Sequence, residues 1–352
     1  MKTVLAIIGC GRIANNAHLP ALSQMENVRI KYACDVIPEK AAALKEKFPI
    51  IEQTVEDYQT VLRDSEVDAV FVLVPNYAHY TVTMDALRAG KHVMCEKPIT
   101  VNYALSCEMA ALARETGKIL NIGVCNRHHK SVEMLADMNA RGELGSVYHV
   151  VCSFRSCRSI PGLGGAFTDK TQSGGGVLID WGIHFLDLIL YILGGAKLKN
   201  VTCDTYCEMA KDMKSYKYKS MWAEDTADVE NGVNDVDDFV TGYIRTDKAS
   251  ISFNGAWAQN LDKNEMYIDF LGDKKGVRLA YGGKFQIFSG DTLLTEAPEY
   301  EIPNMYLEED RAFVESCVSG VKDKNHIDNI LESAKLLDAL YESAAQNREV
   351  TL

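Results

Sequence analysis

Apolar and polar positions follow two different patterns along the chain, and the change falls near residue 125. In 1–124, short apolar runs typical of strands alternate with segments of helical period. This order predicts a parallel, doubly wound sheet, because parallel strands need crossover connections that are usually helical. The predicted strands are Thr3–Ile8, Val28–Cys34, Ala69–Val74, His92–Cys95 and Ile119–Val124, and the predicted helices are Pro38–Lys47, Tyr80–Ala89 and Tyr103–Thr116.

In 125–352 the strand-like runs follow one another with turns between them, and helical segments are fewer. This favours an α+β domain with an open, mostly antiparallel sheet. The expected strands are Ser146–Arg155, Phe239–Ile244, Ala249–Phe253, Met266–Leu271 and Gly276–Ala280, and the expected helices are Ser131–Arg141, Val177–Leu193 and Asp328–Ala345. We therefore expect two domains, 1–124 and 125–352. Glu208–Asp238 is polar and becomes acidic, which favours a solvated excursion, with a lid or a subunit contact as the alternative.

Composition narrows the class of protein. The chain has 352 residues and a formal net charge of -12, which argues against a nucleic-acid partner because the field repels phosphates. The start, MKTVLAIIGCG, is interpreted as a first strand rather than a secretion signal, and no apolar run approaches the roughly 18 residues of a membrane span. A cytoplasmic protein is expected. The ten cysteines are scattered without metal-ligand spacing, so no metal site is expected.

A glycine-rich run directly follows the first predicted strand. Its sequence is Gly9-Cys10-Gly11-Arg12-Ile13-Ala14, the GxGxxG/A pattern of dinucleotide-binding folds. The first glycine permits the tight turn, the second lets a pyrophosphate approach the backbone, and the alanine keeps the helix close to the strand. The phosphates would then lie at the helix N-terminus.

Asp35 ends the second predicted strand, about twenty residues after this run, where an acid binds the adenosine ribose hydroxyls. Val36 and Ile37 follow it, so no arginine is adjacent to accept a 2′-phosphate. This favours NAD over NADP. The alternative role for Asp35 is a helix cap or turn residue.

Two further motifs suit redox chemistry on an alcohol. Lys97, in Glu96-Lys97-Pro98, follows a strand of the parallel sheet, where ligands bind. Asp180 and His184 are four residues apart on a predicted helix and share one face, and the glycines at 174–176 would permit close approach of a ligand. Histidine titrates near neutral pH and is a natural base for the hydroxyl proton, while a lysine stabilises developing negative charge. Singly, each residue has a structural alternative: a surface cation, a helix-start acid and a core histidine.

Taken together, these motifs resemble the glucose–fructose oxidoreductase, inositol dehydrogenase and MocA family. The resemblance covers nearly the whole chain in order and spacing. It rests on the runs GCGRIA from Gly9, VPNYAH from Val74, AGKHVMCEKP from Ala89 and GGGVLIDWGIHFLD from Gly174. It implies a Rossmann domain and an open-sheet domain, an NAD cofactor, and oxidation of a secondary hydroxyl of a sugar, glycoside or cyclitol.

The resemblance also implies residue roles. Lys97 would be the catalytic lysine, His184 the general base and Asp180 its substrate-binding partner. Cofactor contacts would come from the Gly9–Ala14 run, Asp35, Pro75, Asn76, His79, Glu96 and Lys97. A homo-oligomer, either a dimer or a tetramer, is expected as well.

Three arginines are candidate substrate contacts. Arg127 resembles a family position near the substrate, but His128 and His129 follow it where the family often has an aromatic residue, and this pair favours a solvated loop. Arg155 and Arg158 border a loop rich in glycine that resembles the subset oxidising glucosides at carbon 3, which includes C-glycoside oxidoreductases. If that loop lines the site, both arginines would bind substrate oxygens.

Two other functions remain open. The first is an NAD-dependent glycosidase that oxidises its substrate transiently, eliminates the aglycone and returns the hydride. The second is a non-enzymatic sugar or nucleotide sensor, although such regulators lack the catalytic set that Lys97, Asp180 and His184 would form.

Overall fold

The computed structural model describes residues 2–280 and 285–352. The chain forms two units, one of 1–128 with 303–331 and the other of 129–302 with 332–352. The segment Pro303–Leu331 therefore packs with the N-terminal part, which the division into 1–124 and 125–352 did not include. Its helix α9 (Met305–Ser319) buries Phe313 and Val314 in the same cluster as the first strands, so it completes that core.

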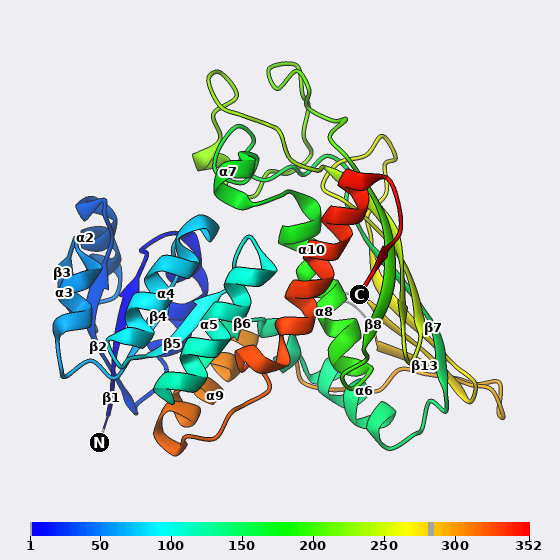
Figure 1. Cartoon of the computed structure of the whole chain (residues 1–352), viewed down its shortest axis with the longest axis horizontal. Coiled ribbons are helices and arrows are strands. Elements are labelled where there is room, and N and C mark those ends of the chain that lie inside the picture. Colours follow the sequence, from blue (N-terminus) through cyan, green and yellow to red (C-terminus); the bar gives the residue numbers. More distant parts are fainter. Residues whose placement is uncertain (1, 281–284) are drawn as a thin grey trace. The chain divides into compact units, whose positions relative to one another are not determined.

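The first unit is built on a six-stranded sheet whose neighbouring strands all pair in parallel, in the order β3-β2-β1-β4-β5-β6 (Figure 1). The strands are β1 Thr3–Ile8, β2 Val28–Cys34, β3 Ile51–Val55, β4 Ala69–Val72, β5 His92–Glu96 and β6 Leu120–Gly123. The helices are α1 Leu19–Leu22, α2 Pro38–Lys47, α3 Tyr58–Arg63, α4 His79–Arg88, α5 Tyr103–Thr116 and α9. This is the expected doubly wound sheet, and its strand order reverses between β1 and β4, where such folds bind ligands.

The second unit contains a nine-stranded sheet in the order β14-β13-β12-β11-β7-β10-β9-β8-β15. Only the pair β7–β10 is parallel among its described strands. The strands are β7 Val147–Arg155, β8 Leu198–Tyr206, β9 Phe239–Thr246, β10 Ser250–Ala256, β11 Glu265–Gly272, β12 Lys275–Ala280, β13 Phe285–Ser289, β14 Thr295–Glu296 and β15 Val350–Thr351. The expected open, mostly antiparallel sheet is confirmed.

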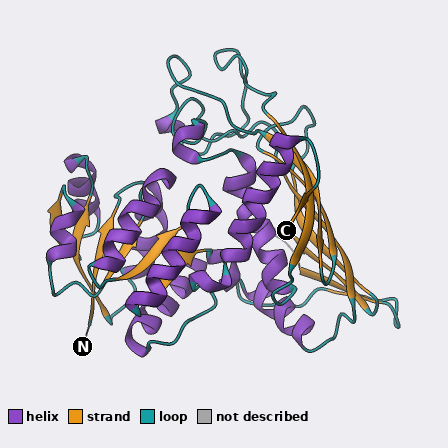
Figure 2. Cartoon of the chain, in the orientation of Figure 1, coloured by secondary structure: helices purple, strands orange, loops and turns teal. Residues whose placement is uncertain are grey.

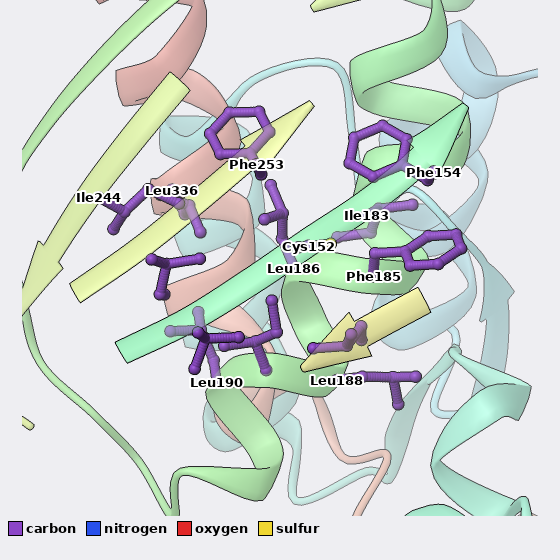
Figure 3. Close-up of a cluster of buried hydrophobic side chains, with 14 of the residues drawn as sticks. Cys152, Phe154, Ile183, Phe185, Leu186, Leu188, Leu190, Ile244, Phe253 and Leu336 are labelled. Carbon is purple, nitrogen blue, oxygen red and sulfur yellow. The ribbon is translucent and has the colours of Figure 1, made fainter. Parts of the chain in front are cut away.

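Helices cover one face of this second sheet, as Figure 2 shows in purple against orange strands. The covering helices are α6 Lys130–Ala140, α8 Ile183–Ile192 and α10 Leu331–Gln346. A short helix, α7 Lys170–Ser173, precedes α8 in the chain. Side chains of α8 and the strands interlock in the core, where Phe154 stacks on Phe185 with ring centroids 5.1 Å apart (Figure 3). By length and composition the helical stretch Lys170–Ile192 could cross a membrane, but 78% of its most apolar window is buried inside the protein, as expected of a core helix.

Two π-helical turns interrupt the helices that carry predicted site residues. One spans Ala14–His18 after the glycine run, and the other spans Leu178–Gly182 around Asp180. Single π turns inside helices occur frequently at functional sites. Their positions agree with the two places that the motifs indicate.

Candidate active site

The glycine run leaves open space at the end of β1. Gly9 has a φ of +99°, and a Cβ on it would lie 2.4 Å from the carbonyl oxygen of Leu73, so only glycine fits there. At Gly11 a Cβ would meet nothing within 4 Å, while Ala14 is fully buried. A tight turn, an open backbone and a close-packed helix are the three features that a pyrophosphate site of this type requires.

Asp35 lies directly after β2, and its carboxylate is tied to this loop. Oδ2 accepts a hydrogen bond from the Cys10 backbone N–H at 2.9 Å, and Oδ1 accepts one from Ile37 N–H at 2.9 Å. An ionised carboxylate has about four acceptor positions, so both oxygens retain capacity for ribose hydroxyls. The turn role and the ribose role of Asp35 are therefore compatible.

The predicted cofactor contacts in the segment after β4 differ from one another in solvent exposure. Pro75 is exposed and Asn76 half-buried, whereas His79 is only 1% exposed. The ring of His79 lies between two backbone carbonyls, with Nδ1 2.7 Å from Pro98 O and Nε2 3.0 Å from Val74 O. Burial lowers its pKa, but the Cys95 thiol and these carbonyls outweigh burial and raise the pKa to about 9. His79 thus links the loop after β4 to the loop after β5.

Glu96 and Lys97 lie where β5 ends. The Glu96 side chain is buried, and its Oε2 accepts a hydrogen bond from the Lys97 backbone N–H at 3.0 Å. Lys97 is half-buried, and its bond to Pro98 is cis. In this unit the Gly9–Ala14 run, Asp35, Pro75 and Lys97 follow the carboxyl ends of β1, β2, β4 and β5, the edge where parallel sheets bind ligands.

Arg127 has a structural role that the sequence did not reveal. It is 2% exposed, and its guanidinium donates to the carbonyls of Lys324 at 2.6 Å and Asn329 at 3.1 Å. The expectation of a solvated loop after it is wrong, because His128 is 5% exposed and His129 is half-buried and accepts from Ser131 N–H at the start of α6. The substrate role of Arg127 stays a prediction.

In the second unit, Asp180 and His184 are more exposed than most of their neighbours. Both are half-buried, whereas Ile179, Gly182, Ile183 and Phe185 around them are buried. Ile183, Phe185, Leu186 and Leu188 are among the core side chains in Figure 3. The helix therefore packs its apolar side inward and leaves Asp180 and His184 accessible in this unit.

Two of the three glycines before this helix, Gly175 and Gly176, pack against other parts of the protein, a role that the sequence did not indicate. A Cβ on Gly175 would lie 2.1 Å from the Tyr341 hydroxyl oxygen, and one on Gly176 would lie 1.9 Å from the Asp237 carbonyl oxygen. The buried Asp237 carboxylate accepts hydrogen bonds from Gly176 N–H and Leu178 N–H, both at 2.8 Å, and from the Tyr341 hydroxyl at 2.9 Å. Asp237 therefore caps the helix that carries Asp180 and His184.

The segment 208–238 also differs at its end from the expected solvated excursion. Asp237 and Asp238 are 7% and 2% exposed. Asp238 accepts from the Met209 backbone N–H, and burial raises its pKa to about 7. The two acids fix the end of the excursion to the unit, while its middle stays largely exposed and irregular.

Arg155 and Arg158 are engaged with neighbouring side chains. Arg155 forms an ion pair with Glu265 on β11. Arg158 has a φ of +58°, donates to Asn260 and lies 5.2 Å from the Tyr216 ring centroid. Their predicted role in binding substrate oxygens remains a prediction.

The chain matches known proteins along most of its length. Residues 4–124 match a family model described as an oxidoreductase family with an NAD-binding Rossmann fold, and 132–278 match the GFO/IDH/MocA C-terminal domain. A D-glucoside 3-dehydrogenase of Escherichia coli is 31% identical over 99% of this chain and 97% of its own length. A structure of aldose-aldose oxidoreductase from Caulobacter crescentus with glycerol superposes with a TM-score of 0.84 at 23% identity over the full length of both chains. A structure of levoglucosan dehydrogenase with NADH and levoglucosan superposes with a TM-score of 0.85 at 18% sequence identity. The match covers 100% of this chain and 99% of that one.

Proposed function

The chain belongs to the GFO/IDH/MocA oxidoreductase family, and on that premise we propose that it is an NAD-dependent dehydrogenase acting on a secondary hydroxyl of a sugar or glycoside. The observation that supports this most is the combination of an NAD-binding fold with an open backbone at Gly11 and an acid at Asp35. The open backbone suits the pyrophosphate of a dinucleotide, and the acid suits one that has a free ribose 2′-hydroxyl.

We propose Lys97, Asp180 and His184 as the residues that act on the substrate. Oxidation removes the hydroxyl proton and a hydride from the same carbon, and the product is a ketone. NAD supplies the hydride acceptor when it is bound. His184 takes the proton, Lys97 stabilises the negative charge that develops on the oxygen, and Asp180 holds a neighbouring hydroxyl or orients His184.

For the substrate we propose a glucoside oxidised at carbon 3. The support is the similarity to the Escherichia coli D-glucoside 3-dehydrogenase, which extends over 99% of the chain at 31% identity. Free aldoses and inositols are the alternatives within the same reaction class.

A substrate panel tests the proposal. Each reaction contains purified protein, NAD and one candidate substrate from a panel of methyl and aryl glucosides, free aldoses and inositols. NADH formation is followed by absorbance, and the products are identified by mass spectrometry. We expect NADH to form in equal amount with a product that has lost two hydrogens. Release of the aglycone without net NADH would instead indicate the glycosidase, and no reaction in either direction, with keto-sugars and NADH included, would contradict an enzymatic role.

Asp35 gives a separate prediction about the cofactor. Asp35→Asn keeps one oxygen to accept from the Cys10 N–H but loses the charge, so we expect the preference for NAD over NADP to fall by roughly 10- to 100-fold, the value of a charge-assisted hydrogen bond. Titration calorimetry with both cofactors measures the ratio of dissociation constants. Equal losses for NAD and NADP would show that Asp35 does not bind the ribose. Glu39→Gln, an exposed acid in the first turn of α2, is the matched control.

We also propose a cytoplasmic homo-oligomer, a dimer or a tetramer, that assembles through the uncovered face of the nine-stranded sheet. That face carries large partly exposed side chains, including Tyr148 at 59% and Tyr243 at 36%. Exposed sheet faces of this kind favour association. Light scattering of the purified protein measures the mass, and a monomer at micromolar concentration would contradict this proposal.

A further inference from the structure

A buried chain of hydrogen bonds runs from α9 to the backbone of Lys97. Asp310 Oδ1 lies 2.8 Å from His18 Nδ1, and His18 Nε2 lies 3.1 Å from Glu96 Oε1. The other oxygen of Glu96, Oε2, accepts from the Lys97 N–H at 3.0 Å. Each group in this chain belongs to the first unit, and three different elements contribute them.

The surroundings hold these side chains in place. His18 and Asp310 are fully buried, and Glu96 is 7% exposed. The His18 ring is packed edge-on between the rings of Phe71 and Tyr306, at centroid distances of 5.3 and 5.5 Å. On the neighbouring strand β6, a Cβ on Gly123 would lie 2.9 Å from Glu96 Oε1, so glycine leaves the room that the carboxylate occupies.

We propose that His18, held by Asp310, is a positioning residue that fixes the Glu96 carboxylate and, through it, the backbone of Lys97. The inference rests on the proposed function, in which Lys97 acts on the substrate. His18 itself needs no contact with substrate or cofactor for this role.

The groups that contact His18 indicate the protonation state of its ring. Both of its ring nitrogens face carboxylate oxygens. An ionised carboxylate only accepts, so beside two ionised carboxylates the ring donates from both nitrogens and carries a positive charge. Burial lowers the pKa of His18, but Asp310 and Glu96 outweigh it and hold the pKa well above its usual value. Asp310 therefore keeps the imidazolium charged, and the imidazolium offsets the charge of Glu96 in a dry environment.

Glu309 lies in the same cluster, and its ligand atom lies within 4.8 Å of those of His18 and Asp310, a set that could also hold a metal ion. A metal would need a lone pair on a His18 nitrogen, but both nitrogens face acceptors at hydrogen-bond distance. Burial raises the pKa of Glu309 well above its usual range, which favours its neutral form. We therefore interpret the cluster as a proton-sharing network.

Two substitutions at His18 separate positioning from general stability. In His18→Gln the amide nitrogen replaces Nε2 and can still donate to Glu96, while in His18→Asn it replaces Nδ1 and can donate only to Asp310. We expect His18→Asn to lower kcat/KM by roughly 10- to 100-fold, as small misplacements of reacting groups do, and His18→Gln to lower it much less. Melting temperatures should fall by similar amounts in both. His92→Gln, at the opposite end of β5, is the control and should keep wild-type activity.

Equal activities of the Asn and Gln variants, or losses that follow their melting temperatures, would overturn the inference. The wild-type protein in the same assay separates the two hypotheses. An inactive wild type would contradict the proposed function, whereas an active wild type with equally active Asn and Gln variants would contradict only the inference about His18.

A readout independent of activity is the protonation of His18, followed by NMR of protein labelled with ¹⁵N-histidine between pH 6 and 9. The titratable groups that face the ring are Glu96 on β5, and Tyr306, Glu309 and Asp310 on α9. We expect both ring nitrogens to stay protonated at about pH 8, where an ordinary histidine is neutral, and Asp310→Asn to bring deprotonation to lower pH. A neutral His18 ring at pH 7 in the wild type would refute the inference.

Discussion

Replacing Lys97 or His184 by alanine is expected to lower turnover by roughly 10²- to 10⁴-fold while the protein stays folded. Lys97 follows β5 and His184 lies on α8, and each is half-buried in its own unit rather than part of a core. Truncation therefore removes a reacting group without opening a cavity. Steady-state rates with the substrate found in the panel, together with circular dichroism melting curves, measure both quantities.

The controls use the same substitutions at positions without a proposed catalytic role. Lys199→Ala removes an exposed lysine on β8, and His149→Ala removes a histidine that contacts Ser250 and Ser252 on β10. Both should retain near wild-type turnover. Lys97→Arg keeps the charge but changes its geometry, so it should remain strongly impaired. Turnover near wild type in Lys97→Ala or His184→Ala would show that the catalytic assignment is wrong.

Loss of the cap at Asp237 should give the largest effect on stability. Asp237→Ala leaves Gly176 N–H, Leu178 N–H and the Tyr341 hydroxyl without their acceptor in the interior. Each orphaned buried donor costs about 1–3 kcal/mol, so the free energy of unfolding should fall by about 3 kcal/mol or more. Because these groups begin the helix that carries Asp180, kcat/KM should fall as well. Urea unfolding followed by fluorescence measures the first quantity.

Two comparisons sharpen this experiment. Asp237→Asn keeps one acceptor oxygen and should lose less stability than Asp237→Ala. Asp204→Ala, at an exposed acid on β8, should change the free energy of unfolding by less than about 0.5 kcal/mol. If Asp237→Ala unfolded at the wild-type urea concentration, the capping role would be refuted.

The sequence predicted the elements whose apolar pattern is strong. β1, β2 and α2 have the predicted bounds, because their buried faces are continuous or periodic. β3 was missed because only Ile51 at its start is buried and its next three residues are exposed, as at the edge of a sheet. α9 was missed although Phe313 and Val314 are fully buried, because the acidic run Glu308–Asp310 interrupts the apolar pattern of its first half.

The site was predictable where a local motif encodes it. The Gly9–Ala14 run needs only its own backbone geometry, so its spacing identifies it. Asp237 contacts partners 59 to 104 residues away in sequence, and His18 contacts partners 78 to 292 residues away, and no short motif reports such contacts. Asp237 also lies in a polar segment that suggested solvent exposure. The end of this segment does carry one sign of a structural role, because two adjacent acids directly precede the strand β9.

The most direct test of the central claim is transfer of a labelled hydrogen. Methyl glucoside carrying deuterium at carbon 3 is incubated with the enzyme and NAD, and the reduced cofactor and the sugar product are analysed by mass spectrometry. The account predicts that the deuterium appears in the reduced cofactor and that the product is a 3-keto-glucoside. Reduced cofactor without deuterium would contradict oxidation at carbon 3, and deuterium retained in the sugar without any reduced cofactor would contradict hydride transfer to NAD.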